Sequence, residues 1–298
     1  MKSVCVVIPT LNAGAQLGRL LERLLAQTVR PREIVVVDSQ SSDGTAALAR
    51  GFDGVRVLEV ARADFDHGGT RDWALRQTQS EFVAFMTQDA LPVDENSLAR
   101  LLAPFEDVSV AAVGGRQIAY GHASAAEKLV RARNYPAESR IWRAEDIDRL
   151  GVRAFLISDV FSCYRREAYL AVGGFDHPIM TNEDMLIAER LLHAGYALAY
   201  QGSAAVYHSH DLTLSQQFRR NLIVGRTMKR YEARFEHVQE MGEGVALARS
   251  VLGSLARQGK LIDCARFGAD CAARLAGNRI GRWQEARALK KTEENSHG

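Results

Sequence analysis

Four short apolar runs, each followed by a stretch with helical spacing, constrain the fold of this chain more than any other feature. The first run is VCVVI at residues 4–8, and leucines then recur with the three- and four-residue spacing of a helix face at positions 17, 20, 21, 24 and 25. Similar alternation returns after the runs at 33–38, 55–60 and 82–87. Strands that alternate with helices form a sheet covered on both faces. The sequence therefore predicts an α/β fold with a mostly parallel, doubly wound sheet.

Polar residues cluster directly after each of these four strands. The segments are PTLN, DSQSSDGT, DFDHGGTR and QDALP. In a doubly wound sheet, ligands bind beyond the carboxyl ends of the strands. We therefore expect the functional site at this edge of the sheet.

The second half of the chain changes character. Apolar runs at 160–166 and 197–208 predict two more strands, whereas residues 121–150 are polar and predict irregular structure. From 214 to 291 the pattern is helical without a strand signal. We expect a sheet-containing domain at 1–212 and a helical extension at 213–298.

The charge is distributed unevenly between these two parts. The net charge of the whole chain is only +2, yet residues 212–298 carry 16 Lys and Arg against 9 Asp and Glu. A basic extension suits an anionic surface such as lipid head groups, although a solvated basic helix needs no partner. In the segment 214–235, Phe218, Leu222, Ile223 and Met228 can share one side of a helix, which either lies on a membrane or packs on the first domain. We expect no nucleic-acid partner.

The cysteines and the N-terminus indicate the compartment. Cys5, Cys163, Cys264 and Cys271 form no CxxC pair, and the first two stand in apolar runs typical of a core. The apolar run at the N-terminus is too short for a signal peptide, and no window is long enough to span a bilayer. These features predict a reduced, cytoplasmic protein whose membrane contact would be peripheral.

The segment MTNEDMLIAERLLHAGY, at residues 180–196, begins with adjacent acids and continues as an apolar helix pattern. Thr181 and Asp184 have the spacing of a capping box, and acids near a helix start favour its dipole. Alternatively, Glu183 or Asp184 serves in catalysis. The segment alone leaves both interpretations open.

Other polar residues at the strand ends have the chemistry of a nucleotide site. Asp38 can accept the N3 proton of a pyrimidine or simply form a turn. Arg71 follows a glycine pair and can meet a diphosphate or solvent. Asp89 is a single carboxylate suited to Mg²⁺ or Mn²⁺, and His208 and His210, two residues apart, point the same way on an extended segment. The GxGxxG and GxxxxGK[ST] motifs are absent, which argues against dinucleotide and P-loop sites.

The order of these motifs resembles a known enzyme family. The opening VVIPTLNAGAQLGRLLERLLAQTVRPREIVVVDSQSSDGT is similar to that of the family 2 inverting glycosyltransferases, which have the GT-A fold. The resemblance continues through YRREAYLAVGGFD and NEDML and covers about residues 3–212. The blocks DFDHGGTR and MTQDALP resemble bacterial rhamnosyltransferases that use dTDP-L-rhamnose to build O-antigen or capsular polysaccharide.

The resemblance implies roles for particular residues. The implied residues of the nucleotide-sugar site are Pro9, Thr10, Asn12, Asp38, Arg71 and Gln88. Asp89 and His208 would hold a divalent metal, Mg²⁺ or Mn²⁺, although Thr87 stands where many members have a first acid. Asp184 matches the general base, which leaves Glu183 as a supporting acid. The amides near Gly68 and Gly69, with Arg71, would help to stabilise the departing diphosphate.

Three alternatives remain at this point. A family 2 transferase could use another donor, such as UDP-glucose or UDP-galactose. A sugar-1-phosphate nucleotidyltransferase has a related core, but PTLNAGAQL does not match the glycine-rich loop that such an enzyme needs. A non-catalytic sugar-nucleotide-binding protein would keep the fold, although Asp89, Asp184 and His208 argue against it. The acceptor is expected to be a polysaccharide or lipid-linked saccharide.

Overall fold

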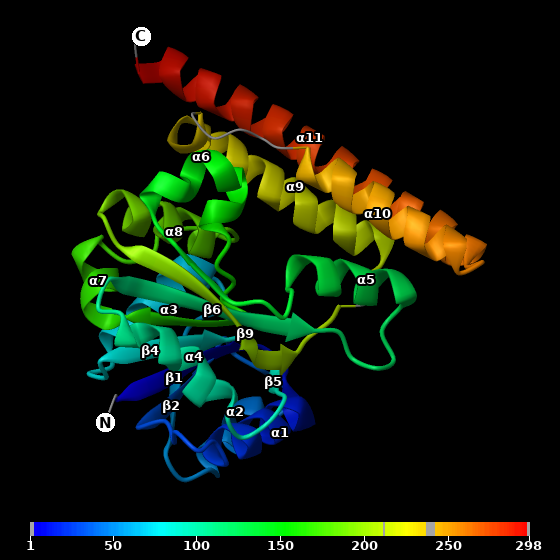
Figure 1. The fold of residues 1–298 in the computed structure, drawn as a ribbon. Coiled ribbons are helices and arrows are strands. Elements are labelled where there is room, and N and C mark those ends of the chain that lie inside the picture. The colour runs from blue at the N-terminus through cyan, green and yellow to red at the C-terminus, as the bar shows by residue number, and fades with distance from the viewer. Residues whose placement is uncertain (1–2, 211, 237–241, 297–298) are drawn as a thin grey trace.

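The computed structural model describes residues 3–210, 212–236 and 242–296. A nine-stranded sheet forms the centre, and the long C-terminal helices lie along one side of it (Figure 1). The strands of this sheet are β1 Val4–Thr10, β2 Glu33–Asp38, β3 Val55–Glu59, β4 Phe82–Met86, β5 Leu91–Pro92, β6 Val110–Ile118, β7 Arg140–Trp142, β8 Phe161–Arg165 and β9 Ala197–Tyr207.

The helices divide into those of the first domain and those of the extension. In the first domain they are α1 Gly14–Leu25, α2 Thr45–Arg50, α3 His67–Arg76, α4 Ser97–Leu102, α5 Ala125–Asn134, α6 Ile147–Leu150, α7 Arg166–Ala171 and α8 Glu183–His193. The extension contains α9 Leu214–Arg230, α10 Glu243–Arg257 and α11 Leu261–Ser296.

The sheet has the order β3-β2-β1-β4-β8-β6-β9-β5, with β7 also paired to β9. β1 is parallel to both β2 and β4, β2 to β3, and β6 to β9. β8 is antiparallel to its neighbours β4 and β6, and β5 and β7 are antiparallel to β9. Most strands therefore run in one direction, which confirms the expected architecture.

Apolar residues pack on both faces of this sheet because successive side chains of a strand point to opposite sides. In β1, Val6 and Ile8 face the helix α1, whereas Cys5 and Val7 join a second core that contains α3 and α8. The α1 leucines expected to face the core do so: Leu17, Leu20, Leu21 and Leu24 are buried. Each such leucine contributes about 2 kcal/mol through burial. The doubly wound arrangement thus follows from the apolar pattern.

The prediction of irregular structure for residues 121–150 is wrong. Helix α5 forms there, with the Ser124 side chain accepting a hydrogen bond from the Glu127 amide at its start. Strand β7 adds to the edge of β9, and the buried Trp142 donates its Nε1 proton to the Ala154 carbonyl at 2.7 Å. The apolar partner of α5 is α10, more than a hundred residues further along the chain. A local sequence pattern contains no information about such a partner.

Helices α9 and α11 pack closely through glycines. A Cβ atom on Gly281 would lie 2.1 Å from the Leu222 carbonyl oxygen, and one on Gly225 would lie 2.2 Å from the Asn278 carbonyl oxygen. Leu222 therefore meets α11, while Met228 packs on the core of the first domain. Part of the apolar side of α9 is thus packed within the protein, whereas Ile223 on that side is 38% exposed, and a membrane role for α9 stays a prediction. None of the described helices is both long and apolar enough to cross a bilayer.

Candidate active site

The carboxyl ends of β1 and β2 lie side by side, with Thr10 opposite Asp38. The Thr10 hydroxyl donates to Asp38 Oδ1 at 3.2 Å, and the Ser41 amide donates to Asp38 Oδ2 at 2.9 Å. Asp38 is buried, and its carboxylate fixes the turn that follows β2. The turn role of Asp38 is therefore present in the structure, and its contact with a base remains a prediction.

The other residues expected to bind the nucleotide sugar gather at the same edge. Asn12 has a left-handed backbone (φ 49°), and its Oδ1 accepts from the Ser42 amide at 2.9 Å. The Gln88 side chain pairs with the backbone of Leu11, accepting from its amide at 2.8 Å and donating to its carbonyl at 3.2 Å. Pro9 is half-buried within β1. The structure brings these residues together, and their contact with a nucleotide stays a prediction.

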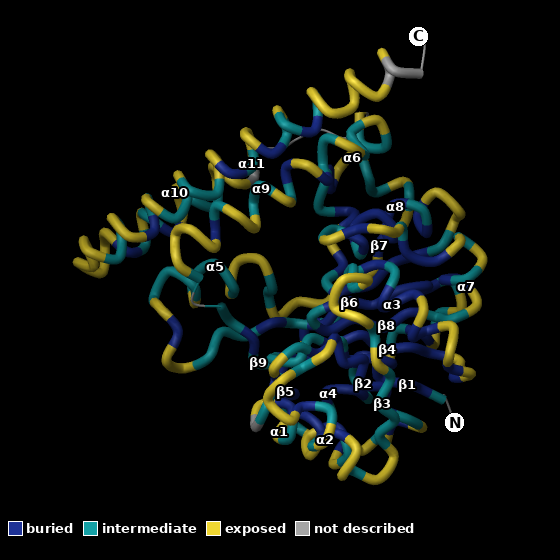
Figure 2. The backbone as a smooth tube through the Cα atoms, turned by 180° about the vertical axis from the view of Figure 1, so that it is seen from behind, coloured by how far each residue is buried: buried dark blue, intermediate teal, exposed yellow. Residues whose placement is uncertain are grey.

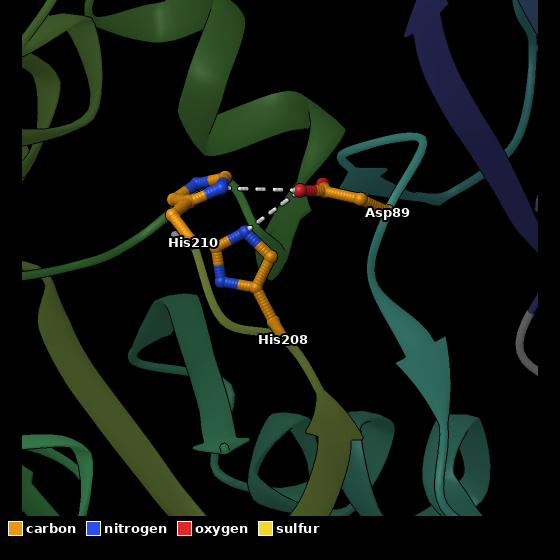
Figure 3. A group of neighbouring side chains, drawn as sticks. All are labelled: Asp89, His208 and His210. Carbon is orange, nitrogen blue, oxygen red and sulfur yellow. Dashed lines mark ion pairs between the residues drawn. The ribbon is translucent and has the colours of Figure 1, made fainter. Parts of the chain in front are cut away.

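Asp89, His208 and His210 converge just beyond β4 and β9 (Figure 3). His208 Nε2 lies 3.3 Å from Asp89 Oδ2, and His210 Nδ1 lies 3.5 Å from the same oxygen. One ligand atom from each residue lies within 4.8 Å of the other two. One carboxylate oxygen and two imidazole nitrogens form a donor set suited to a divalent transition metal.

The hydrogen bonds around His208 fit a cation at this place. Its Nδ1 lies 2.9 Å from Gln117 Oε1, and Arg131 donates to that same oxygen, which fixes the orientation of the amide. Because an amide oxygen only accepts, Nδ1 donates its proton to Gln117 and Nε2 is the atom left to face Asp89. Nε2 is buried without a hydrogen-bond partner and faces Asp89. This atom can pair with Asp89 directly when the imidazole is protonated, and together with Asp89 it can ligate a cation when the imidazole is neutral.

His210 is also available as a neutral ligand. Burial is the main cause that lowers its pKa to about 4. Near pH 7 the imidazole is therefore uncharged and can donate a lone pair.

A cavity of ≈ 850 Å³ extends from this cluster to the start of α8. Both His210 and Asp184 line it. The C-terminal extension supplies part of the wall, through Arg220, Ile223, Val224, Gly244 and Leu247. The sequence does not assign these five residues to the site, because no local motif shows that α9 and α10 reach the strand ends.

Arg71 and two acids form a buried group in the wall of the cavity. Arg71 Nη1 donates to Glu183 Oε1 at 2.9 Å, and Arg71 Nε lies 3.9 Å from Asp159 Oδ2. The Arg71 side chain is only 4% exposed. This ion pair holds Glu183, so that Asp184 is the acid left without a cationic partner among the described residues. The contact of Arg71 with a diphosphate stays a prediction.

Asp184 is half-buried at the start of α8. Its Oδ1 accepts from the Met185 amide at 2.8 Å, and its Oδ2 accepts from the Asp159 amide at 3.3 Å. The capping box expected from Thr181 is not formed, because Asn182 is the N-cap residue, in a left-handed conformation (φ 66°) without a side-chain cap. The interpretation of Thr181 as the cap of α8 is therefore wrong.

Burial and neighbouring acids raise the pKa of two carboxyl groups here. Burial, and then the charges of Glu183 and Asp159, raise the pKa of Asp184 well above its usual range. Burial likewise raises the pKa of Asp159 to about 6, against the lowering effect of Arg71. A carboxylate in such surroundings is more basic than one in water, which suits proton abstraction.

The glycine pair before Arg71 has a structural role. The Gly69 amide donates to Asp66 Oδ1 at 2.7 Å, and the Gly68 amide donates to the Ile179 carbonyl at 3.4 Å. A Cβ atom on Gly68 would lie 2.1 Å from the Asp176 carbonyl oxygen. Both amides are thus already paired, which contradicts the expectation that they stabilise a diphosphate.

Comparison with known proteins identifies the family. The sequence pattern of glycosyl transferase family 2 matches residues 5–173. The chain belongs to this family. This glycosyltransferase is 37% identical over 227 residues to the O-antigen chain rhamnosyltransferase WbaN of Salmonella anatum, covering 76% of this chain and 72% of the relative. It is 34% identical over 223 residues to the O-antigen chain rhamnosyltransferase RfbN of Salmonella typhimurium, covering 74% and 71% of the two chains.

The fold of this glycosyltransferase also matches a solved structure. The mannosyltransferase PcManGT from Pyrobaculum calidifontis, in complex with GDP-Man and Mn²⁺, superposes with a TM-score of 0.61 at 20% sequence identity. The match covers 96% of this chain and 86% of that protein. This likeness confirms the GT-A fold.

Proposed function

We propose that this glycosyltransferase moves L-rhamnose from dTDP-L-rhamnose to a hydroxyl of a polysaccharide or lipid-linked saccharide, with inversion at the anomeric carbon. The observation that carries the proposal is the match of about three quarters of the chain to two O-antigen chain rhamnosyltransferases. The cavity supports it, because it joins an acid without a cationic partner among the described residues to a donor set for a metal.

Asp184 is the general base of this proposed transfer. The acceptor hydroxyl gives its proton to the Asp184 carboxylate as its oxygen forms a bond to the anomeric carbon. The bond from that carbon to the diphosphate oxygen breaks, and dTDP leaves with the electron pair. Attack from the face opposite the leaving group inverts the configuration and needs only one catalytic carboxylate. Arg71 assists by holding Glu183 in an ion pair.

Asp89, His208 and His210 would hold Mg²⁺ or Mn²⁺ in this proposal. When bound, the ion would neutralise charge on the donor diphosphate. The buried, unpaired Nε2 of His208 supports this assignment. The site has a single carboxylate, so we expect weak metal binding that the donor's own phosphate oxygens strengthen.

We further propose that residues 1–212 bind the donor and perform the transfer, while residues 213–298 complete the cavity. Arg220, Ile223 and Leu247 support this division, since they line the same cavity as Asp184. The proposed location is the cytoplasm, with peripheral contact at the inner face of the membrane, where lipid-linked acceptors would be met.

A donor screen tests the proposed function. The purified protein is incubated with Mn²⁺ and dTDP-L-rhamnose, UDP-glucose or UDP-galactose, with and without lipid-linked saccharides, and products are measured by mass spectrometry. We expect hydrolysis or transfer with dTDP-L-rhamnose. Turnover of a UDP-sugar alone would favour the second candidate, a family 2 transferase with another donor. No turnover of any donor would indicate a sugar-nucleotide-binding protein.

A further inference from the structure

The outer side of α11 exposes apolar side chains along much of its length. Ile262 is 71% exposed, Ile280 is 40% exposed and Trp283 is 58% exposed. Separations of eighteen and three residues place all three near one line of a helix with 3.6 residues per turn. Ala269 and Ala276, both exposed, lie between them on the same side. Figure 2 shows the exposed positions along this helix, which forms the outer edge of the molecule.

The exposed charges of α10 and of most of α11 are basic, and Glu294, near the C-terminal end of α11, is an exposed acid. Between Gly244 and Lys291, no side chain described as exposed is acidic. Two of the acids in this span are already paired: Asp270 with Arg274, and the buried Glu285 with Arg230. The exposed basic residues of the span are Arg249, Arg257, Lys260, Arg266, Arg279, Arg287, Lys290 and Lys291.

Trp283 and Arg287 form a pair within this surface. The Arg287 guanidinium carbon lies 4.9 Å from the centre of the Trp283 ring. Tryptophan prefers the boundary between lipid and water, and arginine beside it can reach the head groups. The pair therefore has the chemistry of an interfacial anchor.

We propose that this outer face of α11, with its flanking basic residues, docks on an anionic lipid bilayer. Trp283 and Ile280 enter the interface, while Arg279, Arg287 and Lys290 meet the head groups. A second copy of the chain fits this face poorly, because a two-fold contact would bring the same basic residues against each other. The charge therefore favours an anionic surface over self-association.

This docking places the cavity one helix away from the membrane. Helix α9 packs on α11 through Gly277 and Gly281, and it lines the cavity through Arg220 and Ile223. The presentation of a lipid-linked acceptor to Asp184 rests on the proposed function, whereas the binding to lipid does not depend on it.

Sedimentation of the full chain with vesicles tests the proposal. We expect binding to phosphatidylcholine vesicles that contain phosphatidylglycerol, little binding to pure phosphatidylcholine, and release by salt. Each basic residue near an anionic surface strengthens binding about fivefold. The double variant Arg279→Glu/Arg287→Glu should therefore lose more than about tenfold in affinity. Trp283→Ser should also weaken binding.

Matched controls separate this surface from general charge effects. Arg30→Glu/Arg32→Glu makes the same charge change at exposed positions before β2 and should lose much less affinity. Donor hydrolysis by each variant reports whether it is folded, and absence of hydrolysis in the unchanged protein would count against the proposed function without affecting lipid binding. Equal loss in both double variants, binding that ignores phosphatidylglycerol, or a change in oligomeric mass in place of lipid binding would overturn the proposal.

Discussion

At the scale of single residues, the surroundings of Asp184 give a sharp test of its role. Asp184→Asn keeps the size and can still hydrogen-bond an acceptor hydroxyl, but it cannot take the proton. We expect turnover to fall by about 10²- to 10⁴-fold. Binding of dTDP should change little, and the thermal unfolding midpoint should fall only slightly. Oδ1 can still accept from the Met185 amide, and only the 3.3 Å hydrogen bond from the Asp159 amide to Oδ2 is lost. Rate at saturating substrates and dTDP affinity measure the two effects.

A helix-capping role forecasts a different result. Asparagine is tolerated near helix starts. If Asp184 only caps α8, Asp184→Asn should lower the free energy of unfolding by at most about 1 kcal/mol and should leave the activity nearly unchanged. If Asp184→Asn retains more than about a tenth of the turnover, against the general-base magnitude above, Asp184 is not the base. Asp159 and Glu183, which lie beside it, would then be tested in the same way.

Asp159 makes stability depend on pH in a particular direction. Burial raises its folded-state pKa from 3.8 to about 6, so the folded state holds the proton more tightly than the unfolded chain does. The free energy of unfolding therefore falls by up to about 3 kcal/mol as the pH rises from about 4 to about 6. Urea unfolding across this range measures it. Asp184, whose pKa is also raised, adds a dependence of the same sign, so Asp159→Asn should reduce the slope of the curve without removing it. An unchanged curve would contradict the assignment to Asp159.

Residue types at the strand ends were predictable from sequence, but their partners were not. Asp89 and His208 stand after strands, and the parallel sheet brings such ends together. The Arg71–Glu183 ion pair joins residues 112 positions apart in the sequence, and the hydrogen bonds between Gln88 and Leu11 join residues 77 positions apart. Neither pair leaves a local signal, so the sequence did not show that acids hold Arg71.

At the scale of elements, the α9–α11 contact depends on glycines that leave no room for a side chain. Gly281→Ala adds a Cβ atom 2.1 Å from the Leu222 carbonyl oxygen, which forces the helices apart. We expect a loss of about 1–3 kcal/mol in the free energy of unfolding, as for other overpacked contacts. Chemical denaturation followed by circular dichroism measures it.

Gly268→Ala is the matched control in the same helix. No neighbouring atom lies within 4 Å of the place that its Cβ atom would take, and alanine favours helix by up to about 1 kcal/mol over glycine. This variant should therefore be as stable as the unchanged protein or more so. Equal effects of the two substitutions would show that helix propensity, and not the contact with α9, sets the result.

Elements with strong internal patterns were predicted well, and those that depend on distant partners were not. The α1 leucines and the β1 run each carry their own periodicity, and both lie where expected. Helix α5 has no buried residue and is stabilised by packing on α10, and β7 has only three residues. Short or marginal elements of this kind form because of tertiary contacts, which the local pattern does not contain.

At the scale of the whole molecule, the first domain and the extension together enclose the cavity. The sequence predicted the edge of the sheet where the site lies, because the carboxyl ends of parallel strands must meet. It did not predict the wall made by α9 and α10. That wall includes Arg220 and Leu247, which reach the site only when the extension folds back over the first domain.

Metal and nucleotide should stabilise the whole molecule together. A ligand that binds only the folded state adds about 2.7 kcal/mol at a hundred times its dissociation constant. We expect dTDP to raise the thermal unfolding midpoint strongly with Mn²⁺ and weakly in EDTA, because Asp89, His208 and His210 would hold the ion against the diphosphate.

Variants of this cluster test the role of each ligand. Asp89→Ala should abolish the Mn²⁺-dependent part of the stabilisation, since it removes the only carboxylate in the cluster. His208→Ala should reduce it less, because His210 still offers a nitrogen. Full stabilisation and full turnover in excess EDTA would contradict a metal role for this cluster.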